Sequence, residues 1–315
     1  MRQTISYIFP VYNNSASLKE LLKQVRVVMK KSAPEYATQF IFVNDGSRDD
    51  SLKVLRELAA KYEDVLVLSL SRNFGHQAAV SAGLDHTIGD AVIIMDADLQ
   101  DPPRVCAELI VKWEEGNQVV YAQRRTRKDS VFKRITANVY YRALAKMSSV
   151  SIPRNTGDFR LVDKKVVEVV RTMHEYHRFL RGMFSYVGFT QAAVPFDRDA
   201  RVGGKSEYTI KKLMKLAKAG VFGFSDAPLQ FVTRLGFTVS VLSVVGILYA
   251  IALRIFFPWI TVPGWTMIVV AVFFMGGVQL VMLGVIGEYI GRIYNEVRNR
   301  PTYVVAEEFG NGKKA

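Results

Sequence analysis

Residues 90 to 103 read DAVIIMDADLQDPP, a short apolar run that ends on two carboxylates one residue apart. The apolar part, Ala91 to Met95, has the length and the branched side chains of a buried strand. Asp96 and Asp98 follow directly. Two neighbouring anions at a strand end are costly without a positive group between them, and Mg2+ is commonly held by one or two carboxylates together with substrate phosphates. The stretch therefore predicts a metal-assisted site for a phosphorylated substrate, with a polar turn as the alternative.

Apolar and amphipathic segments alternate on both sides of this strand. Strands are expected at residues 5–11, 39–43, 65–69, 91–95 and 118–122, and helices at residues 17–29, 49–61, 77–87 and 103–115. This rhythm predicts an α/β domain with a Rossmann-like, mostly parallel sheet that is covered on both faces.

Four of the expected strands end on polar residues. These are Tyr12-Asn13, Asn44-Asp45-Gly46-Ser47, Ser71-Arg72-Asn73, and Asp96 with Asp98. Ligands of parallel sheets bind beyond the C-terminal ends of the strands. Each group alone could be a turn or a helix cap, but together they predict one crevice.

Two long uncharged segments lie near the C-terminal end. Residues 235–253 contain no charged side chain, and in residues 265–287 Gln279 is the only strongly polar one. A bilayer core of about 30 Å needs roughly 20 apolar residues in a helix. Soluble helices of this length normally carry a polar face. We therefore expect a transmembrane hairpin of two helices, at about 232–254 and 265–288, with buried core helices as the alternative.

Basic residues flank this hairpin on both sides, with eight between Arg198 and Arg234 and five between Arg292 and Lys314. The positive-inside rule then places the catalytic domain and both termini in the cytoplasm, on a multi-pass protein of the plasma (inner) membrane. No signal-peptide pattern follows Met1. The expected division is a catalytic domain (1–208), an amphipathic interfacial helix and connector (209–230), the two spans (231–291) and a cytoplasmic tail (292–315).

The segment from Thr209 to Phe224 places apolar residues at helical spacing, with four lysines on the other side. This pattern is typical of a helix that lies in the membrane interface, although it also fits a helix packed on the domain. The net charge is +13, and much of the basic excess lies near the spans, where anionic lipids would attract it. No nucleic-acid recognition motif accompanies the charge, so no nucleic-acid partner is expected.

Several stretches resemble the successive motifs of glycosyltransferase family 2, namely FPVYN (9–13), VNDGSRD (43–49), RNFG (72–75) and DADLQDPP (96–103). Three more narrow the resemblance, namely GDFRL (157–161), RVGGKSEY (201–208) and GEYIGRIY (287–294). With the hairpin, they resemble the polyprenyl-phosphate glycosyltransferases, most closely the bactoprenol glucosyltransferase group. The chain departs from the family pattern at Asn14, Asn44 and Lys205-Ser206-Glu207.

The resemblance implies an A-type glycosyltransferase fold and an inverting enzyme that needs a divalent cation, Mg2+ or Mn2+. It implies transfer of a hexose, with UDP-glucose as the expected donor, to undecaprenyl phosphate at the cytoplasmic leaflet. The lipid-linked sugar would then pass to a flippase and a later glycosyltransferase for cell-surface polymers. Alternative donors are UDP-galactose, UDP-N-acetylglucosamine, an aminoarabinose nucleotide, or GDP-mannose with a dolichol-type lipid.

Site residues are carried over by position. The resemblance assigns nucleotide-sugar binding to Pro10, Tyr12, Asn13, Asp45, Asp96, Asp98 and Gln100. It assigns the metal to Asp96, Asp98 and Gln100, and catalysis to Asp98 and Asp158. Phosphate binding falls to Arg160, Arg201, Lys205 and Ser206. Attraction to lipid head groups is the alternative for Arg201 and Lys205, and a solvated strand position is the alternative for Arg160.

Asp158 occupies the place of the family's candidate base. The second pKa of a phosphate monoester is near 6, so a lipid phosphate is already anionic at neutral pH and needs no strong base. We therefore expect Asp158 to orient the acceptor and the metal, or to take a proton only from the monoanion.

Two rival readings remain. A processive polysaccharide synthase would need more spans and a Gln-x-x-Arg-Trp motif, which this sequence lacks. A non-catalytic membrane scaffold or nucleotide-sugar sensor would not need Asp96, Asp98 and Asp158 together.

Glycines 284, 287 and 291 permit close helix packing, and hence a homo-oligomer.

Overall fold

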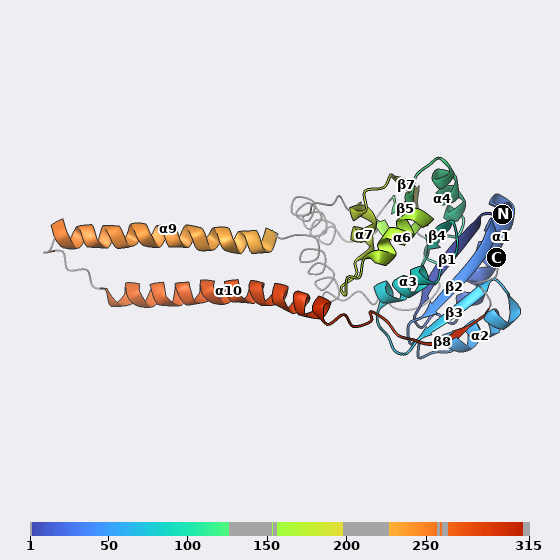
Figure 1. Ribbon diagram of the computed structural model, residues 1–315, viewed down its shortest axis with the longest axis horizontal. Coiled ribbons are helices and arrows are strands. Elements are labelled where there is room, and N and C mark those ends of the chain that lie inside the picture. The colour runs from blue at the N-terminus through green and yellow to red at the C-terminus, as the bar shows by residue number, and fades with distance from the viewer. Residues whose placement is uncertain are drawn as a thin grey trace.

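The computed structural model describes residues 2–125, 153, 156–197, 227–256, 259 and 264–310. In this part of the chain, one mixed sheet has the strand order β7-β5-β6-β4-β1-β2-β3-β8 (Figure 1). The strands are β1 (Thr4–Val11), β2 (Ala37–Asn44), β3 (Val65–Leu70), β4 (Ala91–Ile94), β5 (Val119–Arg124), β6 (Thr156–Asp163), β7 (Gln191–Phe196) and β8 (Val305–Phe309). The helices are α1 (Leu18–Ser32), α2 (Ser51–Lys61), α3 (His76–Asp85), α4 (Val105–Glu114), α6 (Lys164–Thr172), α7 (Leu180–Tyr186), α9 (Ala227–Phe256) and α10 (Trp265–Val297).

The centre of the sheet is parallel and buried on both faces. β1 pairs in parallel with β2 and with β4, and β2 pairs in parallel with β3. Alternate residues face opposite layers: Phe9 and Phe42 pack in the cluster with α1, α2 and α4, whereas Ile8 and Val92 pack with α3, α6 and α7. Burial on both faces explains the nearly continuous apolar runs of these strands. The predicted α/β domain with a mostly parallel sheet is confirmed.

The strand β6 runs antiparallel between β4 and β5, a placement that the alternating pattern did not predict. Its Arg160 lies opposite Ile94 at the end of β4. Because the two strands run in opposite directions, the first residues of β6 lie beside the last residues of β4. This geometry carries Asp158 to the same sheet edge as Asp96.

The helices α9 and α10 lie side by side and project away from the sheet (Figure 1). Both are long and apolar enough to cross a membrane, over Pro228–Leu253 and Val270–Val297, and neither segment is buried inside the protein. Large side chains such as Phe237, Phe273 and Leu280 are more than 70% exposed. Such faces are unfavourable in water, so the helices indicate membrane association, and the alternative of buried core helices is wrong.

The ends of the hairpin differ from the expected bounds. α9 begins at Ala227 and α10 continues to Val297, beyond the apolar segment. The expected interfacial helix falls almost entirely on residues 209–226, which lie outside the described residues.

The segment after α10 returns to the catalytic domain as β8, which pairs antiparallel with β3. Tyr303 donates a hydrogen bond to Asp85 at the end of α3 (2.6 Å), and Glu307 pairs with Arg56 of α2. At Gly310 (φ +95°), an added Cβ would lie 2.2 Å from the Val65 carbonyl oxygen, so this close approach requires glycine. The sequence indicated only a tail here.

Candidate functional site

The crevice predicted from the sequence corresponds to the sheet edge beyond the C-terminal ends of β1, β2 and β4, next to the beginning of β6. Asp45, directly after β2, is 3% exposed. Its two carboxylate oxygens accept hydrogen bonds from the backbone N–H groups of Phe74 (2.7 Å) and Gly75 (3.0 Å). Burial raises the pKa of Asp45, and the two N–H groups offset part of that rise. Asp45 therefore holds the loop that leads into α3.

Asn13 joins the loops after β1 and β2. Its backbone is left-handed (φ 53°), a conformation that asparagine tolerates better than most residues. Its side-chain oxygen accepts a hydrogen bond from Arg48 N–H (2.8 Å), and its own N–H donates to the Ser47 hydroxyl (3.1 Å). Asn13 therefore holds the loop after β1 against the loop after β2.

Pro10 and Tyr12 belong to the same strand end. Pro10 is buried within β1 opposite Val43, beyond the residues of β1 that pair with β4. Tyr12 is half-buried, and its N–H donates to the side-chain oxygen of Asn14 (3.4 Å). Their contact with a nucleotide base stays a prediction.

The acidic motif after β4 forms a tight turn. Asp98 accepts a hydrogen bond from the backbone N–H of Gln100 (3.1 Å), and Leu99 between them has a left-handed φ of 58°. Asp96 is about one-third exposed, and its Oδ1 lies 3.8 Å from His76 Nδ1. Among the residues that the structure describes, no three His, Cys, Asp or Glu side chains converge on one point. Two carboxylates at a crevice edge fit a cation whose remaining ligands come from substrate phosphates and water.

Asp158 lies at the centre of a network between β6, α3 and α7. Its Oδ1 accepts from Arg181 Nε (2.8 Å), and its Oδ2 lies 3.0 Å from His76 Nε2 and accepts from Gln77 Nε2 (3.1 Å). Burial alone would raise the pKa of Asp158, but Arg181 and His76 outweigh burial and hold that pKa well below its usual value. Asp158 is therefore an ionised, fully engaged carboxylate.

His76 bridges the two acidic groups of the crevice. It contacts Asp158 through Nε2 and faces Asp96 through Nδ1. Burial lowers its pKa, but the hydrogen bond to Asp158 and the charge of Asp96 raise the pKa to about 9. An imidazolium between two carboxylates offsets part of their repulsion.

Arg160 projects from β6 on the same face as Asp158. Its guanidinium is 5.1 Å from the centre of the Phe184 ring and donates to the Gly157 carbonyl (3.0 Å). Burial lowers its pKa to about 10, and Asp158 opposes that shift. At 4% exposure Arg160 is not a solvated strand residue, so that alternative is wrong. Phosphate binding by Arg160 stays a prediction, and Arg201, Lys205 and Ser206 lie outside the described residues.

Sequence reasoning did not select His76, Gln77 or Arg181. His76 and Gln77 directly follow the RNFG motif, so a family-based reading could have extended to them. Arg181 had no local signal, because it meets Asp158 only through the packing of α7 against β6.

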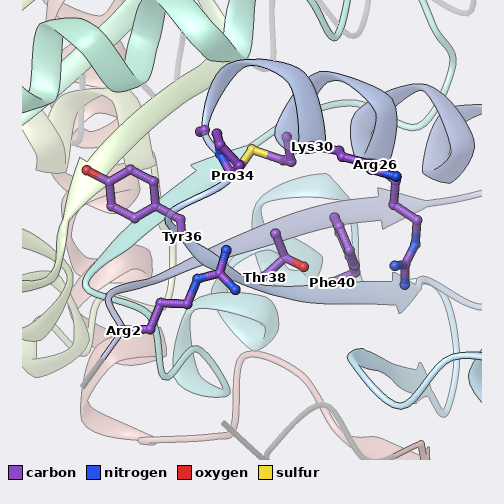
Figure 2. Close-up of a pocket in the computed structure, with 9 residues that line it drawn as sticks. Arg2, Arg26, Lys30, Pro34, Tyr36, Thr38 and Phe40 are labelled. Atoms are coloured by element: carbon purple, nitrogen blue, oxygen red, sulfur yellow. The ribbon is translucent and has the colours of Figure 1, made fainter.

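A cavity of about 310 Å³ lies at the opposite ends of the strands, lined in part by Arg2, Arg26, Tyr36, Thr38 and Phe40 (Figure 2). Its lining residues come from the starts of β1 and β2 and the end of α1, whereas Asp45, Asp96 and Asp98 follow the C-terminal ends of β2 and β4. Its two arginines are already engaged: Arg26 pairs with Asp64, and Arg2 donates to the Glu35 carbonyl. We therefore place the candidate active site in the carboxylate crevice.

Comparison with known proteins identifies the family of the chain. Residues 6–171 match the family described as Glycosyl transferase family 2. The chain is 42% identical to an uncharacterized glycosyltransferase of Bacillus subtilis, over 97% of this chain and 94% of that protein. It is 40% identical to the SfII prophage-derived bactoprenol glucosyl transferase of Shigella flexneri, over 96% and 97% of the two chains. A prophage bactoprenol glucosyl transferase homolog of Escherichia coli is 38% identical over 96% and 98%. The family and the enzyme class expected from the motifs are confirmed: the chain is a glycosyltransferase and belongs to glycosyl transferase family 2.

Proposed function

We propose that this enzyme transfers glucose from UDP-glucose to undecaprenyl phosphate, with inversion, at the cytoplasmic face of the membrane. The observation that carries the proposal is that His76 lies between Asp96 and Asp158 at one sheet edge, with Asp98 two residues after Asp96, on a domain attached to two exposed apolar helices. Similarity to bactoprenol glucosyl transferases over nearly the whole chain supports a polyprenyl-phosphate acceptor.

The donor side of the crevice is built by the loops after β1, β2 and β4. Asp96 and Asp98, with Gln100, would hold a divalent cation against the donor diphosphate. When bound, such a cation stabilises the negative charge that develops on the leaving diphosphate. Pro10, Tyr12 and Asp45 would border the nucleotide, with Asn13 holding the two loops together.

The acceptor side is built around Asp158. A lipid monophosphate is mostly dianionic above pH 7, so its oxygen can attack without losing a proton. Asp158 is bound by Arg181, His76 and Gln77 and has a lowered pKa, which makes it a poor proton acceptor. We therefore assign Asp158 to positioning: it fixes the two cationic side chains beside the reacting phosphate. Arg160, Arg201, Lys205 and Ser206 remain candidates for further phosphate contacts.

The tail supports the proposed topology. Because β8 joins the sheet of the catalytic domain, both lie on one side of the bilayer, as two spans between them require. With the basic residues on that side, the cytoplasmic leaflet is favoured for both termini. The lipid-linked product would then need a flippase before a second glycosyltransferase could use it outside.

The first experiment measures transfer of radiolabelled sugar to undecaprenyl phosphate by the purified full-length protein in nanodiscs. The panel contains UDP-glucose, UDP-galactose, UDP-N-acetylglucosamine, an aminoarabinose nucleotide and GDP-mannose, each with Mg2+, with Mn2+ or with chelator. We expect metal-dependent labelling from UDP-glucose, which Asp98→Ala abolishes. Glu115→Ala, which removes an exposed carboxylate at the C-terminal end of α4 and close to the start of β5, serves as the control.

Labelling from another donor would correct the sugar and keep the reaction class. Nucleotide binding without transfer from any donor would contradict the proposal and favour a sensor or a different acceptor.

A further inference from the structure

The end of α10 contacts the catalytic domain at the loop between α6 and α7, residues 173–179. The Tyr176 N–H donates to both carboxylate oxygens of Glu296, each at 3.0 Å. The next residues also meet, with Asn295 Nδ2 lying 3.4 Å from His177 Nε2. The rings of Tyr176 and His177 pack edge to face at 5.0 Å between centroids. The C-terminal end of α10 therefore contacts the middle of this loop.

The same loop positions the residues of α7 that contact Asp158 and Gln77. It leads directly into α7, where the Leu180 N–H donates to Gln77 Oε1 (2.9 Å) and Arg181 binds Asp158 (2.8 Å). Gln77 also donates to Asp158 (3.1 Å), so the first turn of α7 reaches Asp158 by two routes. A shift of the loop would therefore displace two of the three partners of this carboxylate, Arg181 and Gln77.

The loop is fixed at its first end as well. Arg178 donates to the Met173 carbonyl at the end of α6. Glu175 lies close enough to Glu296 for the two carboxylates to repel, and Arg178 offsets that repulsion. Without the Glu296 contact, the Tyr176 N–H would have to turn to water, and between its two ends the segment would keep the longer contact of His177 with Asn295.

We propose that Glu296 is a positioning residue: by docking on the Tyr176 N–H, it orders the α6–α7 loop and thereby sets Arg181 and Gln77 against Asp158. The inference rests on the proposed function for its effect on sugar transfer, but its structural part stands independently. Its consequence is that the acceptor side of the crevice is fully assembled only when the catalytic domain sits on its own membrane helix.

The structural test is hydrogen–deuterium exchange of the full-length protein in nanodiscs, followed on peptides that cover residues 174–182. We expect Glu296→Ala to speed exchange there at least tenfold. Glu296→Gln keeps an acceptor oxygen and should stay within about threefold of wild type. The matched control, Glu307→Ala, breaks the exposed pair of the tail with Arg56 and should leave these peptides unchanged. Unchanged exchange in Glu296→Ala would overturn the inference, whether or not the enzyme transfers sugar.

The functional test is a double-mutant cycle on kcat with Arg181→Lys, which retains the charge and loses the planar fork. Alone, Glu296→Ala should lower kcat about five- to tenfold, in the range of coupled neighbours, with KM for the nucleotide sugar unchanged and with rescue by Glu296→Gln. In the Arg181→Lys background it should lower kcat by a smaller factor than it does alone, because one of the two routes to Asp158 is already impaired. If the fold reduction in kcat of the double variant equals the product of the two single reductions, Glu296 only attaches α10 to the domain, and the proposed coupling to Arg181 is overturned.

Loss of transfer in the wild type would contradict the proposed function instead. The exchange measurement would still decide the role of Glu296.

Discussion

Two carboxylates of the candidate site, the buried Asp45 and the partly buried Asp158, are held in opposite ways. Asp45 accepts hydrogen bonds from two backbone N–H groups of one loop, and burial raises its pKa. Asp158 is held by three side chains from two helices, two of them cationic, and its pKa is lowered. The donor side is therefore shaped by local backbone geometry, whereas the acceptor side is a charged cluster whose members depend on one another.

The largest expected effect comes from removing the cation that balances Asp158. Arg181→Met leaves a buried carboxylate with His76 and Gln77 only, so we expect the free energy of unfolding to fall by about 3 kcal/mol at pH 7. A depressed pKa stabilises the native state above the unfolded value of about 3.9, and that contribution is lost as pH falls through the folded value. The variant should therefore lose less stability than wild type on acidification.

Urea unfolding of the two proteins between pH 3 and pH 7 measures both effects. Arg26→Met is the matched control, because its pair with Asp64 lies at the far end of the sheet. If the free energy of unfolding changes equally with pH in wild type and Arg181→Met, Asp158 is not held by charge, and it does not differ from Asp45 in this respect.

Asp158→Asn tests the nature of the charged cluster. The amide nitrogen of asparagine would face a donor, either Arg181 or His76, so the cluster cannot close in either orientation. We expect kcat to fall about 100-fold, comparable to the loss of one preorganised transition-state contact, and uniformly from pH 5.5 to 8.5. Rates of sugar transfer across that range check this. Near-normal activity above pH 7 with loss near pH 5.5 would instead identify Asp158 as a base for the protonated acceptor.

Asp45→Asn makes the same substitution on the backbone-held side. One of the two loop N–H groups loses its acceptor, which should cost about 1–2 kcal/mol and loosen the residues before α3. We expect KM for the nucleotide sugar to rise about tenfold while kcat changes little. Initial rates against donor concentration separate the change in KM from the change in kcat. A fall in kcat as large as that of Asp158→Asn would show that the two carboxylates do not differ in role.

The pH dependence of Asp45 should also run in the other direction. Because its pKa is raised in the native state, its contribution is greatest below the unfolded value and is lost as pH rises through the folded value. Urea unfolding of wild type and Asp45→Asn between pH 4 and pH 7 should show a slope of this sign only in wild type.

Asn13→Gly should have the smallest effect. Glycine keeps the left-handed backbone but loses the hydrogen bond to Arg48, so we expect a loss of about 0.5–1 kcal/mol of stability. Asn13→Ala loses the same bond and adds backbone strain, so it should be the more harmful of the two. Thermal unfolding ranks them; equal effects would show that the conformation of Asn13 costs nothing.

The same division decides how much could be predicted from the sequence. Strands β1 to β4 were predicted within two residues at most ends, because their patterns are local and their crossover helices follow directly. The placement of Asp45 after β2, and of Asp96 and Asp98 after β4, at one sheet edge followed from the rule for parallel strand ends. Asp158 was singled out only by resemblance, because β6 enters the sheet antiparallel from far along the chain. Arg181 was missed because no local pattern links α7 to β6.

The strand β8 was missed for a different reason. Its sequence, VAEEF, is short, two of its five residues are acidic, and only pairing with β3 makes it a strand. Propensity and periodicity in five residues cannot reveal such a partner.

The β3–β8 pairing also bears on the order in which the chain is built. An open sheet edge is a template for pairing with other chains, and β8 covers the edge that β3 would otherwise present. During synthesis β3 emerges early, but its cover emerges only after both apolar helices have been made. The nascent catalytic domain therefore carries an unprotected edge until α9, α10 and β8 have been made, so completion of the sheet waits for synthesis of both apolar helices.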